Sequence, residues 1–206
     1  MDSSDYFDNI ASQWDGMRQS FFSNSLRDKV IIAAAAATGM TAADIGAGTG
    51  FLTSALVERG LRVIAVDQSA QMLLELGKKF PQVDTRQGHG EELPLDDATV
   101  DLAVANMYLH HVERPSMAIA EMARILRPDG RLVISDLDRH NHEFLHTEQH
   151  DRWMGFHQKD VAEWLQAAGL EKVKVECANE DCQASSSGRE EKVKVSIFIA
   201  SGVKTN

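Results

Sequence analysis

The sequence lacks any uninterrupted apolar run near the roughly 20 residues that a helix needs to cross a bilayer, and the run from Ile31 to Ala37 is far shorter. Residues 1–5 are polar and acidic, without the basic and apolar regions of a secretory signal. Cysteine is scarce, and only Cys177 and Cys182 are available for a disulfide. These absences argue against a disulfide-stabilised secreted fold and predict a cytoplasmic protein that does not bind membranes.

Clusters of basic residues are also missing. The 206 residues include 31 acidic and 21 basic side chains, which gives a formal net charge of −10. Such a chain repels nucleic acid and anionic membranes at long range. With 43% apolar residues it is long enough to bury one sizeable core. We therefore expect a single domain with a small-molecule partner and no nucleic-acid partner, and the oligomeric state stays open.

From Thr41 onward, short apolar runs alternate with amphipathic segments, which is typical of strands alternating with helices. The predicted strands are 41–45, 62–66, 83–87, 100–105 and 131–136, and the predicted helices are 50–59, 69–79 and 115–126. A helix at 158–168 and two half-buried strands at 171–177 and 192–200 follow, the strands joined by a loop at 184–188. Two helices are predicted before the sheet, at 6–17 and 21–38, the second ending at Gly39.

This pattern predicts an α/β fold that is Rossmann-like and doubly wound. Its sheet is expected to have seven mostly parallel strands, an antiparallel C-terminal edge strand and N-terminal helices. Within the one domain of residues 1–206 we expect an N-terminal helical lid, a cofactor-binding core, a substrate-side segment, and a C-terminal helix with its strand pair. The expected bounds of these parts are 1–39, 40–137, 138–157 and 158–206.

A glycine-rich loop, Asp44-Ile45-Gly46-Ala47-Gly48-Thr49-Gly50, stands between the first predicted strand and the first helix of the sheet. Glycines there allow a tight turn and a close approach of a ligand to the backbone, while the helix start offers free N–H groups. The next strand ends at Asp67, whose carboxylate can accept hydrogen bonds from both hydroxyls of a ribose. This order of elements predicts a nucleotide-like ligand rather than a plain turn followed by a helix cap at Asp67.

Two signatures of other nucleotide sites are missing from the loop. The dinucleotide fingerprint G-x-G-x-x-G requires a third glycine three residues after Gly48, and Phe51 stands at that position instead. The Lys-Ser or Lys-Thr pair of a phosphate-binding loop is missing as well. The sequence thus predicts a ligand with a ribose and no pyrophosphate.

Four segments together make the chain resemble the class I S-adenosylmethionine-dependent methyltransferases over most of residues 40–200. The matching segments are Asp44 to Gly50, Val66 to Ser69, Gly88 to Pro94 and Glu121 to Gly130. The resemblance is to the quinone-biosynthesis type and to methyltransferase domains linked to arsenic-repressor-like regulators. It implies an enzyme that uses S-adenosyl-L-methionine and releases S-adenosyl-L-homocysteine.

By this resemblance the first loop lies against the methionine part of the cofactor, Asp67 holds the ribose, and the segment before Leu93 borders the adenine. The cofactor-binding residues that it implies are Trp14, Asp44, Gly46, Ala47, Gly48, Gly50, Asp67, Gln68, Met72, His89, Gly90, Glu91 and Asn106. The family often has Gly-Asp-Ala-Glu where this chain has Gly-His-Gly-Glu at 88–91. We therefore hypothesise that the His89 imidazole contacts the adenine ring.

Two histidines, His110 and His111, follow the fourth predicted strand, at the edge of the sheet where α/β proteins bind ligands. Imidazole titrates near neutral pH, so either residue is a candidate base for the methyl acceptor. A helix start with one packed and one solvated histidine explains the pair equally well. Methyl transfer depends mainly on alignment, so the base is optional.

A second histidine group, His142-Glu143-Phe144-Leu145-His146, matches the H-E-x-x-H pattern of zinc sites, and His150 extends it by one turn. A zinc hydrolase through His142, Glu143 and His146 is one alternative. A metal-assisted substrate site is another, and residues that only line a polar pocket are the third. The substrate-side residues that we expect are Tyr108, Asp136, His140, His146 and Trp153.

Trp14 lies in the segment Ala11 to Asp15, which resembles the A-x-x-Y-D segment of quinone methyltransferases, where the aromatic side chain caps the cofactor. Packing in the core is the alternative for Trp14. The two cysteines invite comparison with arsenite methyltransferases, although incidental cysteines explain them as well. The sequence predicts methyl transfer to a small-molecule nucleophile, with O, N, C, S and As acceptors all open. A cofactor-binding regulatory module without turnover is the alternative outside enzymes.

Overall fold

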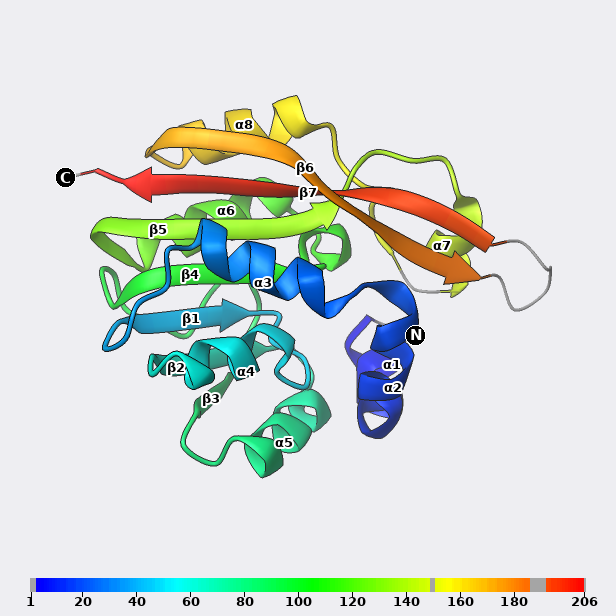
Figure 1. The fold of residues 1–206 in the computed structure, drawn as a ribbon, viewed down its shortest axis with the longest axis horizontal. Helices are drawn as coiled ribbons and strands as arrows, with labels where there is room; N and C mark the ends of the chain where they lie inside the picture. Colours follow the sequence, from blue (N-terminus) through cyan, green and yellow to red (C-terminus); the bar gives the residue numbers. More distant parts are fainter. Residues whose placement is uncertain (1–2, 149–150, 186–191, 206) are drawn as a thin grey trace.

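The computed structural model describes residues 3–148, 151–185 and 192–205. Its centre is a sheet of seven strands in the order β3-β2-β1-β4-β5-β7-β6 (Figure 1). The strands are β1 Thr41–Ile45, β2 Arg62–Asp67, β3 Asp84–Gln87, β4 Val100–Asn106, β5 Leu126–Leu137, β6 Leu170–Ser185 and β7 Lys192–Lys204. Strands β1 to β5 pair in parallel, whereas β7 pairs antiparallel with both β5 and β6. The predicted fold class is confirmed, with the antiparallel strand β7 inserted one place inside the edge.

Helices cover both faces of this sheet. The helical elements are α1 Ser3–Ile10, η1 Ala11–Gln13, α2 Trp14–Phe21, α3 Asn24–Ala33, α4 Phe51–Glu58, α5 Ala70–Lys79, η2 Leu109–His111, α6 Pro115–Arg124, α7 Glu143–Glu148 and α8 Gln158–Ala167. One apolar cluster packs α3, α4 and α5 on one face, and a second packs α6 and α8 on the other. In the parts of the chain described, no helix is long and apolar enough to span a bilayer.

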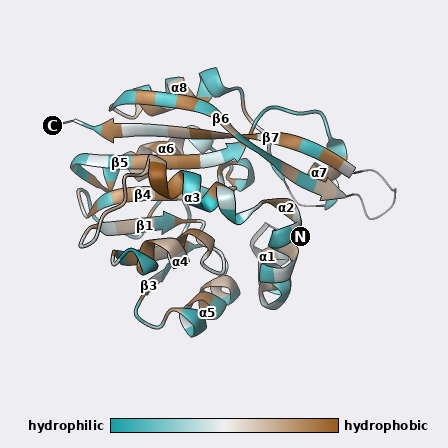
Figure 2. Cartoon of the chain, viewed as in Figure 1, coloured by the Kyte–Doolittle hydropathy of each residue, from teal (hydrophilic) through white to brown (hydrophobic). Residues whose placement is uncertain are grey.

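Strand β1 illustrates how the central strands of the sheet are buried on both faces. All five of its residues are buried, because helices lie on both faces of the parallel sheet. Ala42 belongs to the cluster on one face, and its neighbour Ala43 belongs to the cluster on the other. Figure 2 shows apolar colouring on β4 and on parts of β7, whereas β1 is paler and partly hydrophilic. Burial on both faces keeps the strand ends, and the side chains that follow them, in fixed positions.

The two helices predicted before the sheet are wrong in number and bounds, since the chain forms α1, η1, α2 and α3 there. Helix α3 starts at a cap, where the Ser23 hydroxyl accepts the Ser25 N–H at 3.1 Å. The alanine-rich run favours a longer helix, yet α3 stops at Ala33 because Ala35 adopts a positive φ of 50°. The turn lets the chain reverse into β1, and Gly39, at φ 87°, lies in the connection beyond the helix end.

The C-terminal hairpin extends further than the sequence predicted. Strands β6 and β7 pair from Leu170↔Lys204 to Ser185↔Lys192, with register shifts near Lys174 and Asp181. Ala184 and Ser185 therefore belong to β6, and the rest of the predicted loop lies outside the described residues. Figure 1 shows the far end of this hairpin passing beyond the carboxyl end of β5 toward α7. The helices α1 and α2 lie at the same end of the molecule (Figure 1).

Phe198 on β7 is fully buried in the apolar cluster with α6 and α8. We expect Phe198→Ala to lower the free energy of unfolding by about 3–5 kcal/mol, because the cavity cannot close between a sheet and helices. Leu74→Ala on the exposed side of α5 is the control, with a change of about 0.5 kcal/mol or less. Urea denaturation followed by circular dichroism measures both, and equal losses would contradict the assignment.

Candidate functional site

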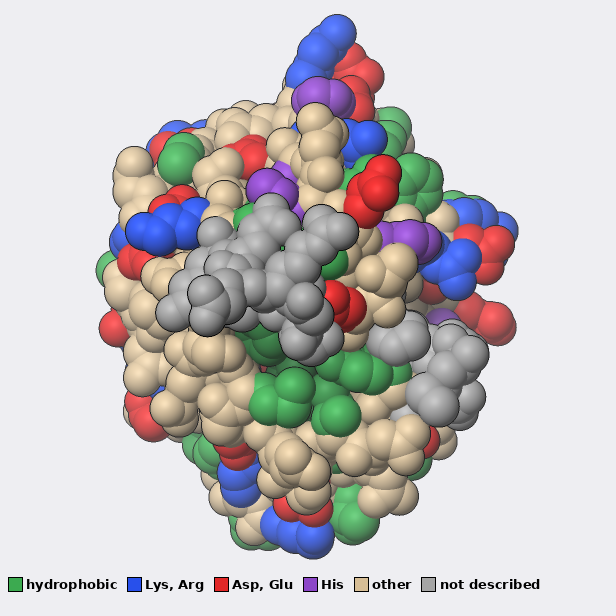
Figure 3. Space-filling view, turned by 90° about the vertical axis from the view of Figure 1, so that its right-hand side faces the viewer, with side chains coloured by type: hydrophobic (Ala, Val, Ile, Leu, Met, Phe, Trp, Pro, Cys, Tyr) green, Lys and Arg blue, Asp and Glu red, His purple; other side chains and the backbone are tan. Residues whose placement is uncertain are grey.

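A cavity opens at the carboxyl ends of β1, β2 and β4, under the N-terminal helices. Figure 3 looks onto this end of the molecule and shows apolar side chains gathered near its centre, with acidic side chains beside them. The lining residues are Tyr6, Phe7, Trp14, Arg18, Phe21, Phe22, Asp44, Gly46, Ala47, Gly48, Phe51, Leu52, Asp67, Gln68, Met72, Asn106, Met107, Tyr108, His110, His111, Leu137, Leu145, Asp151, Cys182 and Ala184. Loops, helices and the end of β6 together form its wall.

Asp44 is the acidic residue at the floor of the cavity. Its side chain is buried at the end of β1 and accepts a hydrogen bond of 2.6 Å from the Thr53 hydroxyl on α4. Burial raises the pKa of Asp44 to about 6, although the bond from Thr53 opposes the rise. A buried carboxylate that faces a cavity is well placed to meet a cationic group of a ligand.

Asp67, at the end of β2, is tied into the glycine loop. Its Oδ2 accepts the Gly48 N–H at 2.8 Å, and its Oδ1 accepts the Ser69 N–H at 2.9 Å. Burial raises its pKa. The cap of α5 is Ser69, whose hydroxyl accepts the Met72 N–H at 3.0 Å. The carboxylate of Asp67 thus holds the loop and the start of α5 in register while it lines the cavity.

Tyr108 fills the space between two glycines. A Cβ atom added at Gly46 would collide with its ring, and one added at Gly90 would collide with its hydroxyl end. Gly46 also has a φ of +67°, which other residues rarely adopt. Burial raises the pKa of the Tyr108 phenol, whose oxygen lies against the Gly90 N–H. Gly46 is therefore required both by the turn and by the tyrosine packed against it.

The N-terminal helices are anchored over the loop by acidic side chains. Asp15 accepts hydrogen bonds of 2.6 Å from the Thr49 hydroxyl and from Lys79 Nζ. Asp8 accepts a bond of 2.5 Å from the Ser69 hydroxyl. Trp14 stands beside Gly48, with its Nε1 3.6 Å from the position of an added Cβ, and this places its ring at the cavity rather than in the core.

On the other side of the cavity, His110 forms a buried dyad with Asp136 at the end of β5. His110 Nδ1 lies 2.6 Å from Asp136 Oδ1. Asp136 also accepts backbone N–H groups from Tyr108 at 3.1 Å, Leu109 at 2.8 Å and Leu137 at 2.7 Å. Burial alone would lower the pKa of His110, yet the nearby carboxylates of Asp136 and Asp151 raise it to about 9. The dyad fixes both the tautomer and the direction of the imidazole.

Asp151 is the cavity residue that the sequence pattern did not reveal. Its buried carboxylate lies 3.7 Å from His110 Nε2, and burial raises its pKa to about 6. No spacing or motif pointed to it, because it lies in an irregular segment far from His110 in the chain. Arg18 and Cys182 were also missed as cavity residues. Cys182 is buried and its pKa is raised to about 12, while Cys177 is exposed on β6.

The structure brings most of the predicted site residues to one cavity. These are Trp14, Asp44, Gly46, Ala47, Gly48, Asp67, Gln68, Met72, Asn106, Tyr108, His110 and His111. The predicted residues that do not line it are Gly50, His89, Gly90, Glu91, Asp136, His140, His146 and Trp153. Of these, Glu91 accepts backbone N–H groups of Glu113 and Arg114, and Trp153 donates to the Val112 carbonyl at 2.9 Å. Gly90 packs against Tyr108, and Asp136 is bonded to His110, so each of the two contacts a residue that lines the cavity.

The H-E-x-x-H segment does not gather its histidines in the described chain. His142 precedes α7 and donates its backbone N–H to His140 Nδ1 at 3.2 Å. His146 is bonded to the backbone oxygen of Asp151, and His150 lies outside the described residues. Burial lowers the pKa of His140 to about 4. Among described residues, the one group of three side chains arranged to hold a metal ion is His110, His111 and Asp151.

Comparison with known proteins adds an independent line of evidence. Residues 43–134 match the methyltransferase domain family. An uncharacterised methyltransferase of Mycobacterium tuberculosis is 52% identical over 89 residues, which are 43% of this chain and 36% of that protein. The demethylmenaquinone methyltransferase of Renibacterium salmoninarum is 31% identical over 133 residues, which are 63% of this chain and 56% of that protein. The chain therefore spans about a third to a half of the length of these relatives.

The fold has a close counterpart among solved structures. The protein described as a methyltransferase in complex with the Haloferax volcanii Trm112 methyltransferase activator superposes with a TM-score of 0.78. The alignment covers 97% of this chain and 98% of that chain at 20% sequence identity. At this identity the likeness establishes the fold alone.

The stability prediction for the site concerns Asp136. We expect Asp136→Asn to lower the free energy of unfolding by about 3–5 kcal/mol, because its amide group would face buried donors and leave them unpaired. Asp138→Asn is the control, since Asp138 accepts only side-chain bonds from Gln158 and Ser196 near the surface, and it should cost about 1 kcal/mol. Thermal and urea unfolding separate the two, and a loss at Asp136 no larger than at Asp138 would refute the role.

Proposed function

We propose that this chain is a class I S-adenosylmethionine-dependent methyltransferase and that it transfers the cofactor's methyl group to a small-molecule nucleophile; the matching methyltransferase domain, the relatives and the fold support this. The observation that supports this most strongly is the tie between the Gly48 N–H and Asp67, which places a carboxylate for a ribose beside the glycine loop. The cavity next to it is lined by aromatic and acidic side chains. The S-adenosyl-L-homocysteine product leaves from the same cavity.

The cofactor is proposed to lie along the carboxyl ends of β1 and β2. Its ribose hydroxyls donate to Asp67, and its cationic amino group lies toward Asp44, which relieves the cost of that buried carboxylate. Gln68 and Met72 line the cavity on the side toward α5. Adenine lies toward the segment of Gly90, and contact with His89 remains the hypothesis for that edge. His89→Ala with unchanged cofactor affinity would remove it.

Methyl transfer needs an in-line approach, in which a nucleophile attacks the methyl carbon as its bond to sulfur breaks and the electron pair stays on sulfur. Aromatic side chains of the N-terminal helices, including Phe7 and Trp14, wall off water from this line. Attraction between an aromatic ring and the cationic sulfonium adds to cofactor binding. The acceptor approaches from the side of His110 and His111, where His111 can take up a proton lost by a neutral nucleophile. The His110 ring, held between Asp136 and Asp151, already carries its second proton at neutral pH because these carboxylates raise its pKa to about 9.

The test of function is methyl transfer from tritiated S-adenosyl-L-methionine into the small-molecule fraction of a cell extract. A transferase forms S-adenosyl-L-homocysteine and places label in a small molecule, whereas a cofactor-binding regulatory module binds the cofactor and forms neither. Chromatography of both products measures the outcome. Cofactor binding with no turnover across extracts from several sources would support the regulatory alternative.

The substitution Asp67→Asn tests whether the Asp67 carboxylate binds the ribose of the cofactor. We expect cofactor affinity by calorimetry to fall about tenfold to a hundredfold, because a charged acceptor of ribose hydroxyls is lost, worth about 1.5–3 kcal/mol. Asp84→Asn on β3 is the matched control, since Asp84 pairs with Arg86 at 2.8 Å on the exposed edge of the sheet. Equal affinities for the two variants, both folded by circular dichroism, would contradict the ribose assignment.

A further inference from the structure

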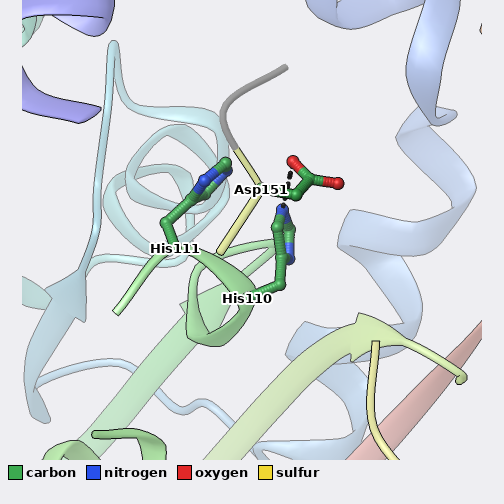
Figure 4. A group of neighbouring side chains, drawn as sticks. All are labelled: His110, His111 and Asp151. Carbon is green, nitrogen blue, oxygen red and sulfur yellow. Dashed lines mark ion pairs between the residues drawn. The ribbon is translucent and has the colours of Figure 1, made fainter. Parts of the chain in front are cut away.

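His110, His111 and Asp151 form a cluster in the wall of the cavity, on the side from which the acceptor is proposed to approach (Figure 4). One ligand atom from each of the three lies within 4.8 Å of the others. We propose that these side chains bind a divalent transition-metal cation. This goes beyond the proposed function, because cation binding does not depend on methyl transfer.

His110 is prepared as a ligand by its neighbour. The 2.6 Å contact of its Nδ1 with Asp136 is a hydrogen bond from the ring to the carboxylate, which leaves Nε2 to face the cavity. Three backbone N–H groups hold Asp136 itself in place. Histidine ligands of metals characteristically donate their other ring nitrogen to a carboxylate in this way. The imidazole is therefore oriented before any cation arrives.

Asp151 supplies the oxygen ligand. Its side chain is 5% exposed, and its Oδ1 stands 3.7 Å from His110 Nε2, which is too long for a hydrogen bond but suits two ligands on one cation. The backbone fixes this spacing, since the N–H groups of Arg152 and Trp153 donate to the His110 carbonyl at 2.9 and 3.0 Å. The irregular segment is thus tied directly to the residue whose ring it faces.

His111 completes the set from the same turn, η2. Its ring centroid lies 4.1 Å from that of His110, and the ring also meets the Phe7 ring in a T-shaped arrangement with centroids 5.1 Å apart. Figure 4 shows both imidazoles rising from η2, with Asp151 above them. Two imidazole nitrogens and one carboxylate oxygen suit zinc, cobalt or iron as divalent ions. Three protein ligands leave a position open toward the cavity.

The surrounding charge favours a cation here. The carboxyl groups of Asp136 and Asp151 flank one buried imidazole, and burial of such groups is costly without a compensating charge. In the metal-free chain a proton on His110 supplies part of this charge, and a divalent ion at Nε2 would take the place of that proton. The H-E-x-x-H histidines form no such set among the described residues. His146 is instead bonded to the Asp151 backbone oxygen, and His140 Nδ1 accepts the backbone N–H of His142.

A consequence for the acceptor rests on the proposed function. A hydroxyl or thiol that enters the open position releases its proton to solvent more readily, because the cation stabilises the anion that remains. The resulting oxygen or sulfur anion attacks the methyl carbon, a new bond to carbon forms, and the sulfonium bond breaks with its electron pair on sulfur. The inference therefore favours acceptors with an ionisable O–H or S–H group over carbon nucleophiles.

The experiment uses the full chain without a histidine tag, stripped of metal by a chelator and then dialysed. Titration with Co²⁺, followed by visible absorption, is expected to give one ion per chain, and Zn²⁺ should displace it. His111→Ala and Asp151→Asn should each weaken Co²⁺ binding at least tenfold. His142→Ala and His157→Ala are the matched controls and should bind as the unaltered chain does, whereas His146→Ala, which removes the bond to the Asp151 backbone oxygen, completes the test of the H-E-x-x-H histidines.

Circular dichroism melting identifies any variant that fails to fold, and Asp151→Asn keeps the size of the side chain. The absence of saturable Co²⁺ binding to the unaltered chain would overturn the proposal. Loss of binding confined to the His142 and His146 variants would overturn it as well. Because the titration needs no cofactor or acceptor, metal binding without methyl transfer would count against the proposed function alone.

Discussion

The buried carboxylate of Asp136 collects three backbone N–H groups and one imidazole at the end of β5. Two of those N–H groups belong to Tyr108 and Leu109, so the carboxylate sets the path of the chain as it leaves β4. The path directs the Tyr108 ring to the glycine loop and the His110 ring to the acceptor side. Because the group is fully buried, none of its bonds can be exchanged for water at low cost. The two ends of the cavity are therefore set by one side chain.

The cofactor side depends on acidic groups in a different way. Asp67 accepts from the loop and from the start of α5, while Asp8 and Asp15 connect the N-terminal helices to Ser69 and Thr49. Each of these bonds attaches a loop or a helix to a residue at or just after the end of β1 or β2. These side-chain acceptors therefore help to hold the N-terminal helices over the cavity, together with ring contacts such as that of Phe7 with His111.

The sequence predicted the parallel strands and the helices between them because burial on both faces of a sheet leaves a periodic apolar pattern. It also identified Asp44, the glycines and Asp67, whose roles follow from their place at strand ends. It did not reveal Asp151, which meets His110 through backbone bonds between distant segments and carries no periodic signal. The H-E-x-x-H spacing misled for a related reason, since helix α7 begins at Glu143 and leaves His142 outside it. The periodic pattern of a sequence predicts its helices and strands. The side of the cavity around His110 depends instead on contacts between segments that are distant in the chain.

The far end of the β6–β7 hairpin has a consequence for divergence. The pairing of β7 with β5 ends at Ile197, whereas its pairing with β6 continues to Lys192, so the ribbon beyond that point is not part of the wider sheet. Cys182 and Ala184 of this ribbon line the cavity. Substitutions there can reshape the acceptor wall without disturbing the parallel strands that carry the glycine loop. The fold thereby separates the glycine loop from this part of the cavity wall, so that the shape of the cavity can change on an unaltered sheet.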